Sequence, residues 1–210
     1  MNKSFRLSLV AAALGLPAFA ASAGQAAQLQ QRDVQQEQRI ANGLRNETLT
    51  AREAGQLQRS ASHIDYLQSR ALADGRISNQ EANRIDHAQD VQGRMITQQM
   101  HDRQYGNAYS QQSRIMLTDA RRDVEQEQRI LDGQRDGSLT AREASRLEYG
   151  QAATSWHAAQ AQATGGVNPW EQQWLRRDDA YNSAAIRDQR HDGDARNVRY
   201  AGSPWSWWGW

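Results

Sequence analysis

Apolar and small residues recur every three or four positions along the segment 51–74. The stripe consists of Ala54, Leu57, Ala61, Ile64, Gln68 and Ala71. This spacing turns one face of a helix toward a partner, and its alanines and its glutamine make the contact narrow. The pattern predicts long helices that pack through narrow seams and are otherwise solvated.

Four short motifs mark where such helices begin. Each has an apolar residue, then Thr, Ser or Asn, then a glutamate three positions later. They are Leu49-Thr50 with Glu53, Ile77-Ser78 with Glu81, Leu139-Thr140 with Glu143, and Val167-Asn168 with Glu171. In such a capping box the first side chain accepts a hydrogen bond from the backbone, and the glutamate accepts one in return.

Glycines indicate where the helices end, because glycine takes the left-handed conformation beyond a helix without steric cost. The positions expected to do so are Gly43, Gly75, Gly133 and Gly165. The predicted helices span about 27–43, 51–74, 79–104, 113–133, 141–163 and 169–191. The expected fold is all-α, an elongated bundle of antiparallel helices joined by short corners.

A duplication organises these helices. Asp33–Leu57 recurs as Asp123–Leu147 at an offset of 90, with 16 of 25 positions identical. The same register continues without a gap to the end of each copy, which predicts two tandem three-helix units. The units are 24–105 and 113–195, joined by a linker at 106–112.

The first 23 residues have the pattern of a signal peptide. Lys3 and Arg6 precede an apolar run at 7–20 that is too short to span a bilayer, and small residues follow. Cleavage after Ala20 or after Ala23 fits the pattern. The sequence therefore predicts an exported protein, periplasmic or secreted.

Composition narrows the function further. The chain has no cysteine, and the predicted signal holds two of its 25 basic residues and none of its 24 acidic ones. The rest is near neutral, with both signs interspersed, which argues against nucleic acid as a partner. The carboxylates are expected on solvated helix faces, paired with arginines. No catalytic motif is present, so we do not expect an enzyme and infer no cofactor.

One segment allows a second interpretation as a calcium loop. The six residues at ligand positions are Asp132, Gln134, Asp136, Ser138 (through its carbonyl), Thr140 and Glu143. In the other copy, Leu44 and Glu47 occupy a ligand position and the turn-glycine position, whereas the capping residues are retained. This comparison favours a helix corner, and calcium binding at 132–143 remains the alternative.

Tryptophans gather toward the C-terminal end. Trp170 and Trp174 are spaced for one helix face and are expected to pack inside the fold. The tail 196–210 is predicted to be disordered, and its last residues include Trp205, Trp207, Trp208 and Trp210. Four tryptophans beside proline and glycine cannot form a core of their own. We expect them to contact a protein partner, an envelope polymer or a membrane interface.

Several of these motifs occur in a loose group of proteins. Arg39-Ile40, Gly43, Leu49-Thr50 and Glu53-Ala54, followed by Ala73–Ser78 with Glu81, resemble small uncharacterised exported proteins of Gram-negative bacteria. Their repeated corners are similar to degenerate EF-hands. The resemblance implies an envelope location and a helical fold, and the stretch 160–170 departs from it. The sequence thus predicts an exported, non-enzymatic helical binding or scaffold protein, or alternatively a divalent-cation binder.

Overall fold

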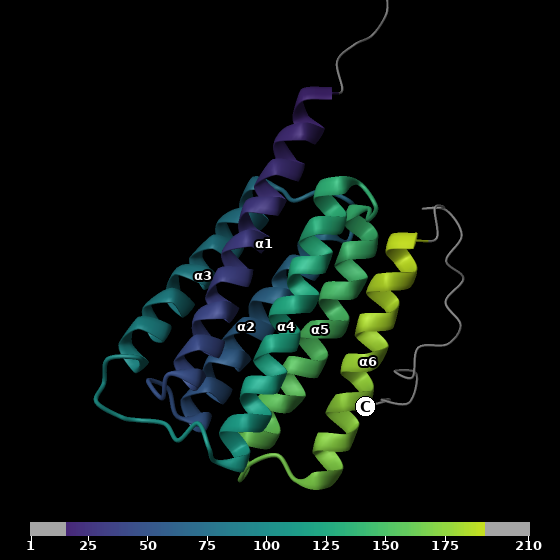
Figure 1. Ribbon diagram of the computed structural model, residues 1–210. Helices are drawn as coiled ribbons and strands as arrows, with labels where there is room; N and C mark the ends of the chain where they lie inside the picture. Colours follow the sequence, from purple (N-terminus) through teal and green to yellow (C-terminus); the bar gives the residue numbers. More distant parts are fainter. Residues whose placement is uncertain (1–15, 192–210) are drawn as a thin grey trace, which may run out of the picture.

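The computed structural model describes residues 16–191, and in this range every regular element is an α-helix (Figure 1). The helices are α1 Leu16–Arg45, α2 Ala51–Leu72, α3 Asn79–Gln99, α4 Gln111–Asp136, α5 Ala141–Ala163 and α6 Pro169–His191. The all-α helical bundle predicted from the sequence is therefore confirmed for the described residues. The predicted ranges of the last two helices match the observed ones, and α4 begins at Gln111, inside the predicted linker.

The centre of the bundle contains helices from both halves of the chain. Helix α2 packs along α5, and α1 packs along α4. Helix α3 packs on α1 and α2 at one edge, and α6 packs on α4 and α5 at the other (Figure 1). Side chains that point inward from α1, α2, α4 and α5 therefore share one interior.

The predicted capping boxes are present. Thr50, Ser78 and Thr140 each accept a hydrogen bond from the backbone N–H of the glutamate three positions later, which accepts one in return. At the start of α6, Asn168 and Glu171 exchange the same two bonds, at 3.0 and 2.8 Å. Because these bonds satisfy amides that a helix leaves free at its start, the motifs locate four helix starts correctly.

Two predicted helix ends are wrong. Helices α1 and α4 continue past Gly43 and Gly133. A Cβ at either glycine would lie 2.5 or 2.6 Å from a leucine Cδ1, that of Leu49 or of Leu139. These glycines allow a leucine from the following corner to pack against the helix. The prediction for Gly75 and Gly165 is confirmed, since both have a positive φ.

Left-handed backbone occurs instead at Glu47 and at Gly137, with φ of 61° and 78°. The two residues are 90 positions apart, so both copies of the corner turn in the same way. Glu47 also holds the connection to α4, because its carbonyl oxygen accepts a hydrogen bond from Gly106 N at 2.8 Å. A Cβ at Gly106 would lie 2.2 Å from the carbonyl oxygen of Leu49.

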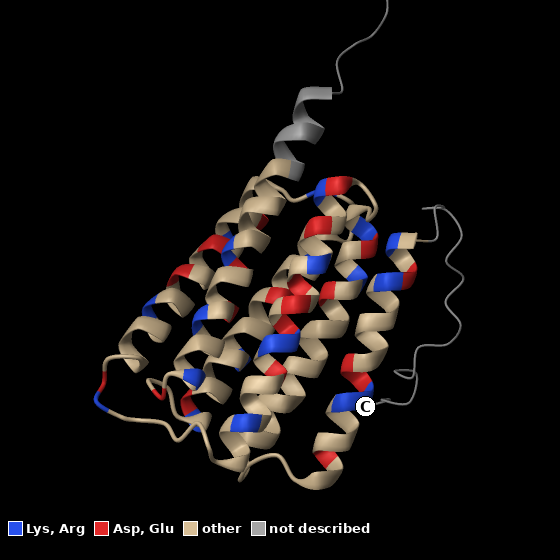
Figure 2. Ribbon diagram, viewed as in Figure 1, with Lys and Arg blue, Asp and Glu red and all other residues tan. Residues whose placement is uncertain are grey.

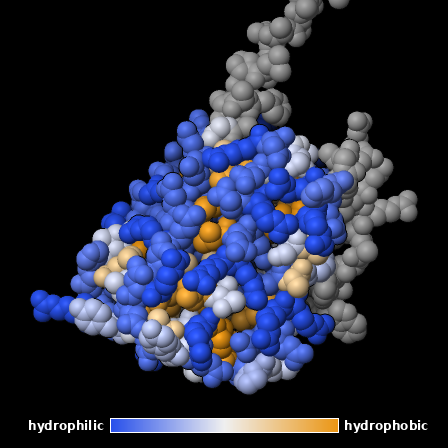
Figure 3. Space-filling view, viewed as in Figure 1, coloured by the Kyte–Doolittle hydropathy of each residue, from blue (hydrophilic) through white to orange (hydrophobic). Residues whose placement is uncertain are grey.

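The apolar core is thin and divided. Within residues 16–191, three separate clusters of buried apolar side chains lie between the helices. All six members of the stripe along α2 are buried. The face in Figure 3 is largely hydrophilic, with apolar residues visible mainly in grooves. Within the described range, no helix combines the length and hydropathy of a membrane span.

Candidate metal centre

The predicted calcium-loop residues have other roles in the structure. Helix α4 runs through Asp132 and Gln134 to Asp136, so the first five loop positions are helical. Asp136 accepts hydrogen bonds from Ser138 N at 2.9 Å and from Arg190 Nη2 at 2.8 Å. Asp132 accepts one from a side chain of its own helix.

Glu143 closes the capping box of α5. Its Oε2 accepts from the backbone N–H and from the hydroxyl of Thr140, both at 2.7 Å. Among the described residues, Asp132, Asp136 and Glu143 do not form a group of converging potential metal ligands. The geometry at 132–143 favours the helix corner over the calcium loop.

A different set of carboxylates lies inside the bundle. Apart from the capping residues Glu53 and Glu143, eight acidic side chains are buried among the described residues: Asp33, Glu37, Asp65, Asp119, Asp123, Glu127, Glu148 and Asp179. No arginine, lysine or histidine is buried in the same range. In Figure 2, acidic positions gather near the middle of α4. The expectation that the carboxylates lie on solvated faces is wrong for these eight.

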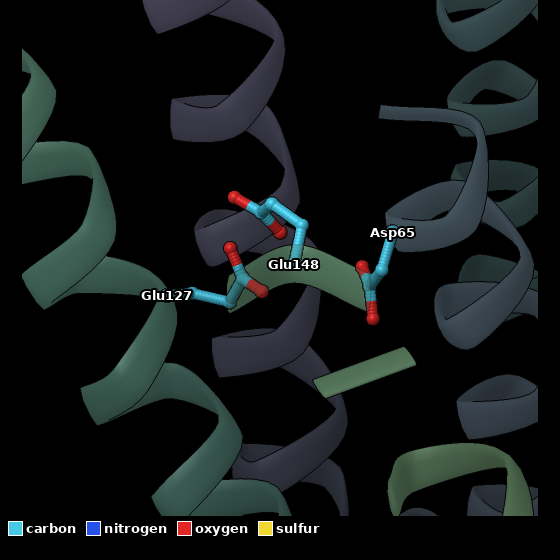
Figure 4. Close-up of side chains that lie close together, drawn as sticks. All are labelled: Asp65, Glu127 and Glu148. Atoms are coloured by element: carbon cyan, nitrogen blue, oxygen red, sulfur yellow. The ribbon is translucent and has the colours of Figure 1, made fainter. Parts of the chain in front are cut away.

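Three of them converge on one point. Asp65 of α2, Glu127 of α4 and Glu148 of α5 turn toward one another (Figure 4), and one oxygen of each lies within 4.8 Å of the others. Their exposed fractions are 5%, 2% and 0%. We call these three residues the triad. They come from three helices and from both halves of the chain, so α2, α4 and α5 must pack together to assemble them.

Few hydrogen-bond donors reach the triad. Gln30 Nε2 donates to Glu148 Oε1 at 2.6 Å. The other oxygen of Glu148 and both oxygens of Glu127 have no hydrogen-bond donor within residues 16–191. Glu127 and Glu148 can hydrogen-bond to each other only when one of the two carboxyl groups carries a proton, because an ionised carboxylate has no hydrogen to donate. A buried carboxylate normally accepts several hydrogen bonds, so these oxygens have room for another ligand.

Burial raises the pKa of each member of the triad, and the charges of nearby carboxylates add to the effect. Loss of solvent raises the pKa of Glu148 to about 8. It raises the pKa of Glu127 well above its usual value, and the nearby charge of Glu148 adds to the effect. Loss of solvent also raises the pKa of Asp65, with a further contribution from Asp33. The site therefore resists ionisation unless a positive charge is supplied.

The energetic cost of an ionised, unpaired group here is large. Removing one carboxylate from water costs several kcal/mol, whereas a folded domain is stable by only about 5–15 kcal/mol in total. Several unpaired carboxylates together would exceed that margin. Their charge is neutralised either by protons or by a bound cation.

The donor set suits a hard cation. It contains only oxygen ligands, which favour calcium, magnesium or manganese over softer metals. Ligand oxygens on opposite sides of a calcium ion lie roughly 4.6–5.2 Å apart, whereas magnesium requires about 4.0–4.2 Å. The triad oxygens all lie within 4.8 Å of one another, a limit that accommodates either ion.

The sequence contained one signal for this interior. Asp33 and Glu37 are four positions apart on one helical face, and the duplication repeats them as Asp123 and Glu127. Spacing of this kind is also typical of solvated helix faces, so it did not reveal burial. Nothing in the sequence linked Glu127 to Glu148 or Asp65.

The predicted aromatic sites have a mixed outcome. Trp205, Trp207, Trp208 and Trp210 lie outside the described residues. Trp170, expected inside the fold, is 72% exposed, so that prediction is wrong. Trp174 is partly buried against an apolar cluster, and both line a groove of about 510 Å³ between α5 and α6.

Comparisons of the chain with protein family models, with curated proteins and with solved structures find no match. The described residues define an all-α bundle with an acidic interior.

Proposed function

We propose that this protein is an exported helical binding protein whose interior holds a hard divalent cation such as calcium. The triad is the proposed site. The observation that carries the proposal is the convergence of three buried carboxylates where no basic side chain is buried among the described residues. A cation would supply the missing charge and occupy the oxygens that lack donors.

Binding, and not catalysis, is the proposed role. The triad side chains are 0 to 5% exposed, which leaves little access for an organic substrate, whereas a dehydrated cation is small enough to be enclosed. The predicted signal peptide at 1–23 supports a periplasmic or secreted location. Calcium is compatible with either compartment.

The internal organisation is part of the proposal. We infer that the bundle consists of two three-helix units derived from the duplication, with α1 on α4 and α2 on α5 as the contacts between them. Equivalent hydrogen bonds support this interpretation. Gln36 Nε2 donates to the carbonyl oxygen of Gln89 at 2.7 Å, and Gln126 donates to that of Asp179 at 3.2 Å, each 90 positions later.

Isothermal titration calorimetry of the purified, chelator-treated protein with calcium chloride at pH 8 tests the cation site. Thermal unfolding with and without calcium provides a second readout. We expect binding heat and a higher Tm in the wild type, and loss of both in Glu127→Gln and Glu148→Gln. The matched control is Glu125→Gln, because Glu125 is exposed on the same helix and the charge change is the same.

A variant of the corner separates the two candidate positions. Asp132→Asn with Asp136→Asn leaves the triad intact and is expected to bind calcium as the wild type does. If calcium binding is lost in this variant and retained in Glu127→Gln, the ion belongs to 132–143. If neither calcium, magnesium nor manganese gives heat or a change in Tm, the cation proposal fails.

A second candidate function is contact with an envelope partner. The exposed Trp170 beside the groove between α5 and α6 supports an aromatic contact surface at this end of the chain. The four tryptophans of the tail are proposed to add to it. Deleting residues 203–210 should abolish capture of a partner from an envelope extract without changing helicity. Unchanged capture would remove the tail from this role.

A further inference from the structure

Two adjoining grooves on the bundle surface are lined by aromatic side chains. The groove between α5 and α6, described above, has a volume of about 510 Å³, and a groove between α2 and α5 has a volume of about 470 Å³. Both volumes are typical of small-ligand sites, which span about 300–1,000 Å³. His157 lines both grooves and so marks where they meet. The other aromatic lining residues are Trp170, Trp174 and Tyr181 in the first groove, and Tyr66, Tyr149 and Trp156 in the second.

The rings at the junction of the grooves contact one another edge to face. The centroid of the His157 ring lies 5.0 Å from that of Trp156 and 4.7 Å from that of Trp174, with interplanar angles of 79° and 78°. Such contacts hold the rings in a fixed orientation. Trp156 and Tyr181 are each 48% exposed, so part of each side chain is free to contact a ligand.

The internal duplication shows that packing does not require the aromatic residues of α6. Helix α3, the equivalent of α6 in the first copy, packs on the bundle without them. At the positions that match Trp170, Trp174 and Tyr181 it has Gln80, Arg84 and Val91. A role at the surface accounts for the three aromatic side chains better than a role in the core.

Polar groups lie among the rings of the groove between α5 and α6. Asp178 lines this groove, and its Oδ2 is buried without a hydrogen-bond partner within residues 16–191. Buried carboxylate oxygens are normally satisfied, so this atom can accept a hydrogen bond from a ligand. The exposed side chains of Gln160 and Arg177 add further hydrogen-bonding groups.

The charges of the lining are balanced. Apart from the histidines, the groups that are ionised near neutral pH are two acids, Glu171 and Asp178, and two bases, Arg59 and Arg177. This balance favours an uncharged ligand over an anionic or a cationic one. It also opposes an anionic membrane surface, which attracts predominantly basic patches.

We propose that the two grooves together bind a neutral oligosaccharide or polysaccharide chain. A sugar ring has an apolar face of C–H groups, which stacks on the negative face of an aromatic ring, and a rim of hydroxyls that donate and accept hydrogen bonds. Stacked rings and the unpartnered Asp178 oxygen match these two features. An extended peptide is a poorer fit, because the described residues 16–191 offer no strand edge to pair with.

This inference rests on the second candidate function, the aromatic contact surface, and names the chemistry of its partner. It uses only residues of the described range and is independent of the cation site. The effect of deleting 203–210 therefore does not bear on it.

Isothermal titration calorimetry of the full chain with N-acetylglucosamine oligomers of two to six units tests the proposal, with cellohexaose as a second sugar. Affinity should rise with length, because a longer chain reaches both grooves. Trp170→Ala and Asp178→Asn should each weaken binding roughly tenfold, and Trp170→Tyr, which keeps a ring, should restore most of it. Trp156→Ala should weaken the hexamer and leave the dimer unchanged.

Tyr109→Ala is the control, because Tyr109 is an exposed aromatic residue outside both grooves. Circular dichroism checks that each variant is folded. The proposal is refuted if no oligomer gives heat at millimolar concentration, or if the oligomers bind Trp170→Ala as tightly as the wild type. If the oligomers fail while neutral phospholipid vesicles or a captured protein bind in a Trp170-dependent way, the sugar is refuted and the aromatic contact surface stands.

Discussion

Glu127 of α4 and Glu148 of α5 turn their carboxyl groups toward each other, with an oxygen of each within 4.8 Å of the other, in a region where no basic residue is buried among those described. Two ionised carboxylates at this separation repel strongly once water is excluded. The protein therefore needs protons or a cation at this point in order to stay folded. The free energy of unfolding of the bundle should therefore depend on the pH and on the concentration of the cation.

Without a cation, the protein should lose stability as the pH rises. The pKa of Glu148, like those of Glu37 and Asp119, is raised to about 8 in the folded protein, whereas unfolded carboxyls titrate near 4. Between these values the unfolded state releases protons that the folded state retains, so the stabilising contribution is complete below about pH 4 and is lost as the pH passes 8. Each pKa unit corresponds to about 1.4 kcal/mol, so a fall of several kcal/mol is expected.

Urea unfolding in chelator from pH 5 to pH 8.5 measures this slope. Calcium should restore most of the lost stability at pH 8 and have little effect at pH 5, where protons occupy the carboxyls. A free energy of unfolding that stays constant or rises across this range would contradict the acidic interior.

Replacing Glu127 with glutamine should stabilise the cation-free protein at pH 8, by roughly 1–3 kcal/mol. The neutral amide has the size of the acid but cannot ionise in the unfolded state. The loss of folding stability that ionisation of Glu127 causes at high pH therefore disappears. The gain should vanish near pH 4, where the glutamate is protonated in both states. Exposed Glu125→Gln should change little at either pH, and destabilisation by Glu127→Gln at pH 8 would count against this account.

The helical fold could be predicted largely from local signals. The four capping boxes and the repeated corners act within a few residues of each other, so the sequence contains the whole interaction. The mispredicted ends at Gly43 and Gly133 show where local reasoning stops. There the glycine allows close packing of Leu49 or Leu139 and does not form the turn.

The acidic interior could not be predicted, because it depends on which helix faces meet. Asp33 and Glu37 lie on one face of α1 that has the pattern of a solvated face. Their burial is evident only once α4 and α5 are packed against α1 and α2. A periodic pattern of apolar residues identifies the helix face that packs in the core. It does not show which other helix a polar face packs against. The duplication repeats both acids at the same spacing, but a duplicated solvated face would show the same pattern.

Gly43→Ala and Gly133→Ala should each destabilise the protein by roughly 1–3 kcal/mol, because the new Cβ would overlap a buried leucine. A double-mutant cycle separates this clash from a general effect on the helix. When Leu49 is first changed to alanine, Gly43→Ala should become neutral or stabilising, since alanine favours a helix over glycine. Thermal unfolding of the four proteins measures the coupling, and additive effects would argue against the packing role.

Glu143 provides the sharpest contrast between a helix cap and an ion ligand. Glutamine also closes a capping box, so Glu143→Gln should change stability by less than about 0.5 kcal/mol, as a substitution that keeps the cap. Glu143→Ala removes the bonds to Thr140 and should cost about 1 kcal/mol, the usual value of a cap. Both variants should bind calcium as the wild type does, because Glu143 lies outside the converging carboxylates. Unfolding and calorimetry of these two variants distinguish the cap from the ion ligand. If Glu143→Gln no longer binds calcium but keeps its stability, the Glu143 carboxylate is an ion ligand. The capping interpretation of this corner is then incomplete.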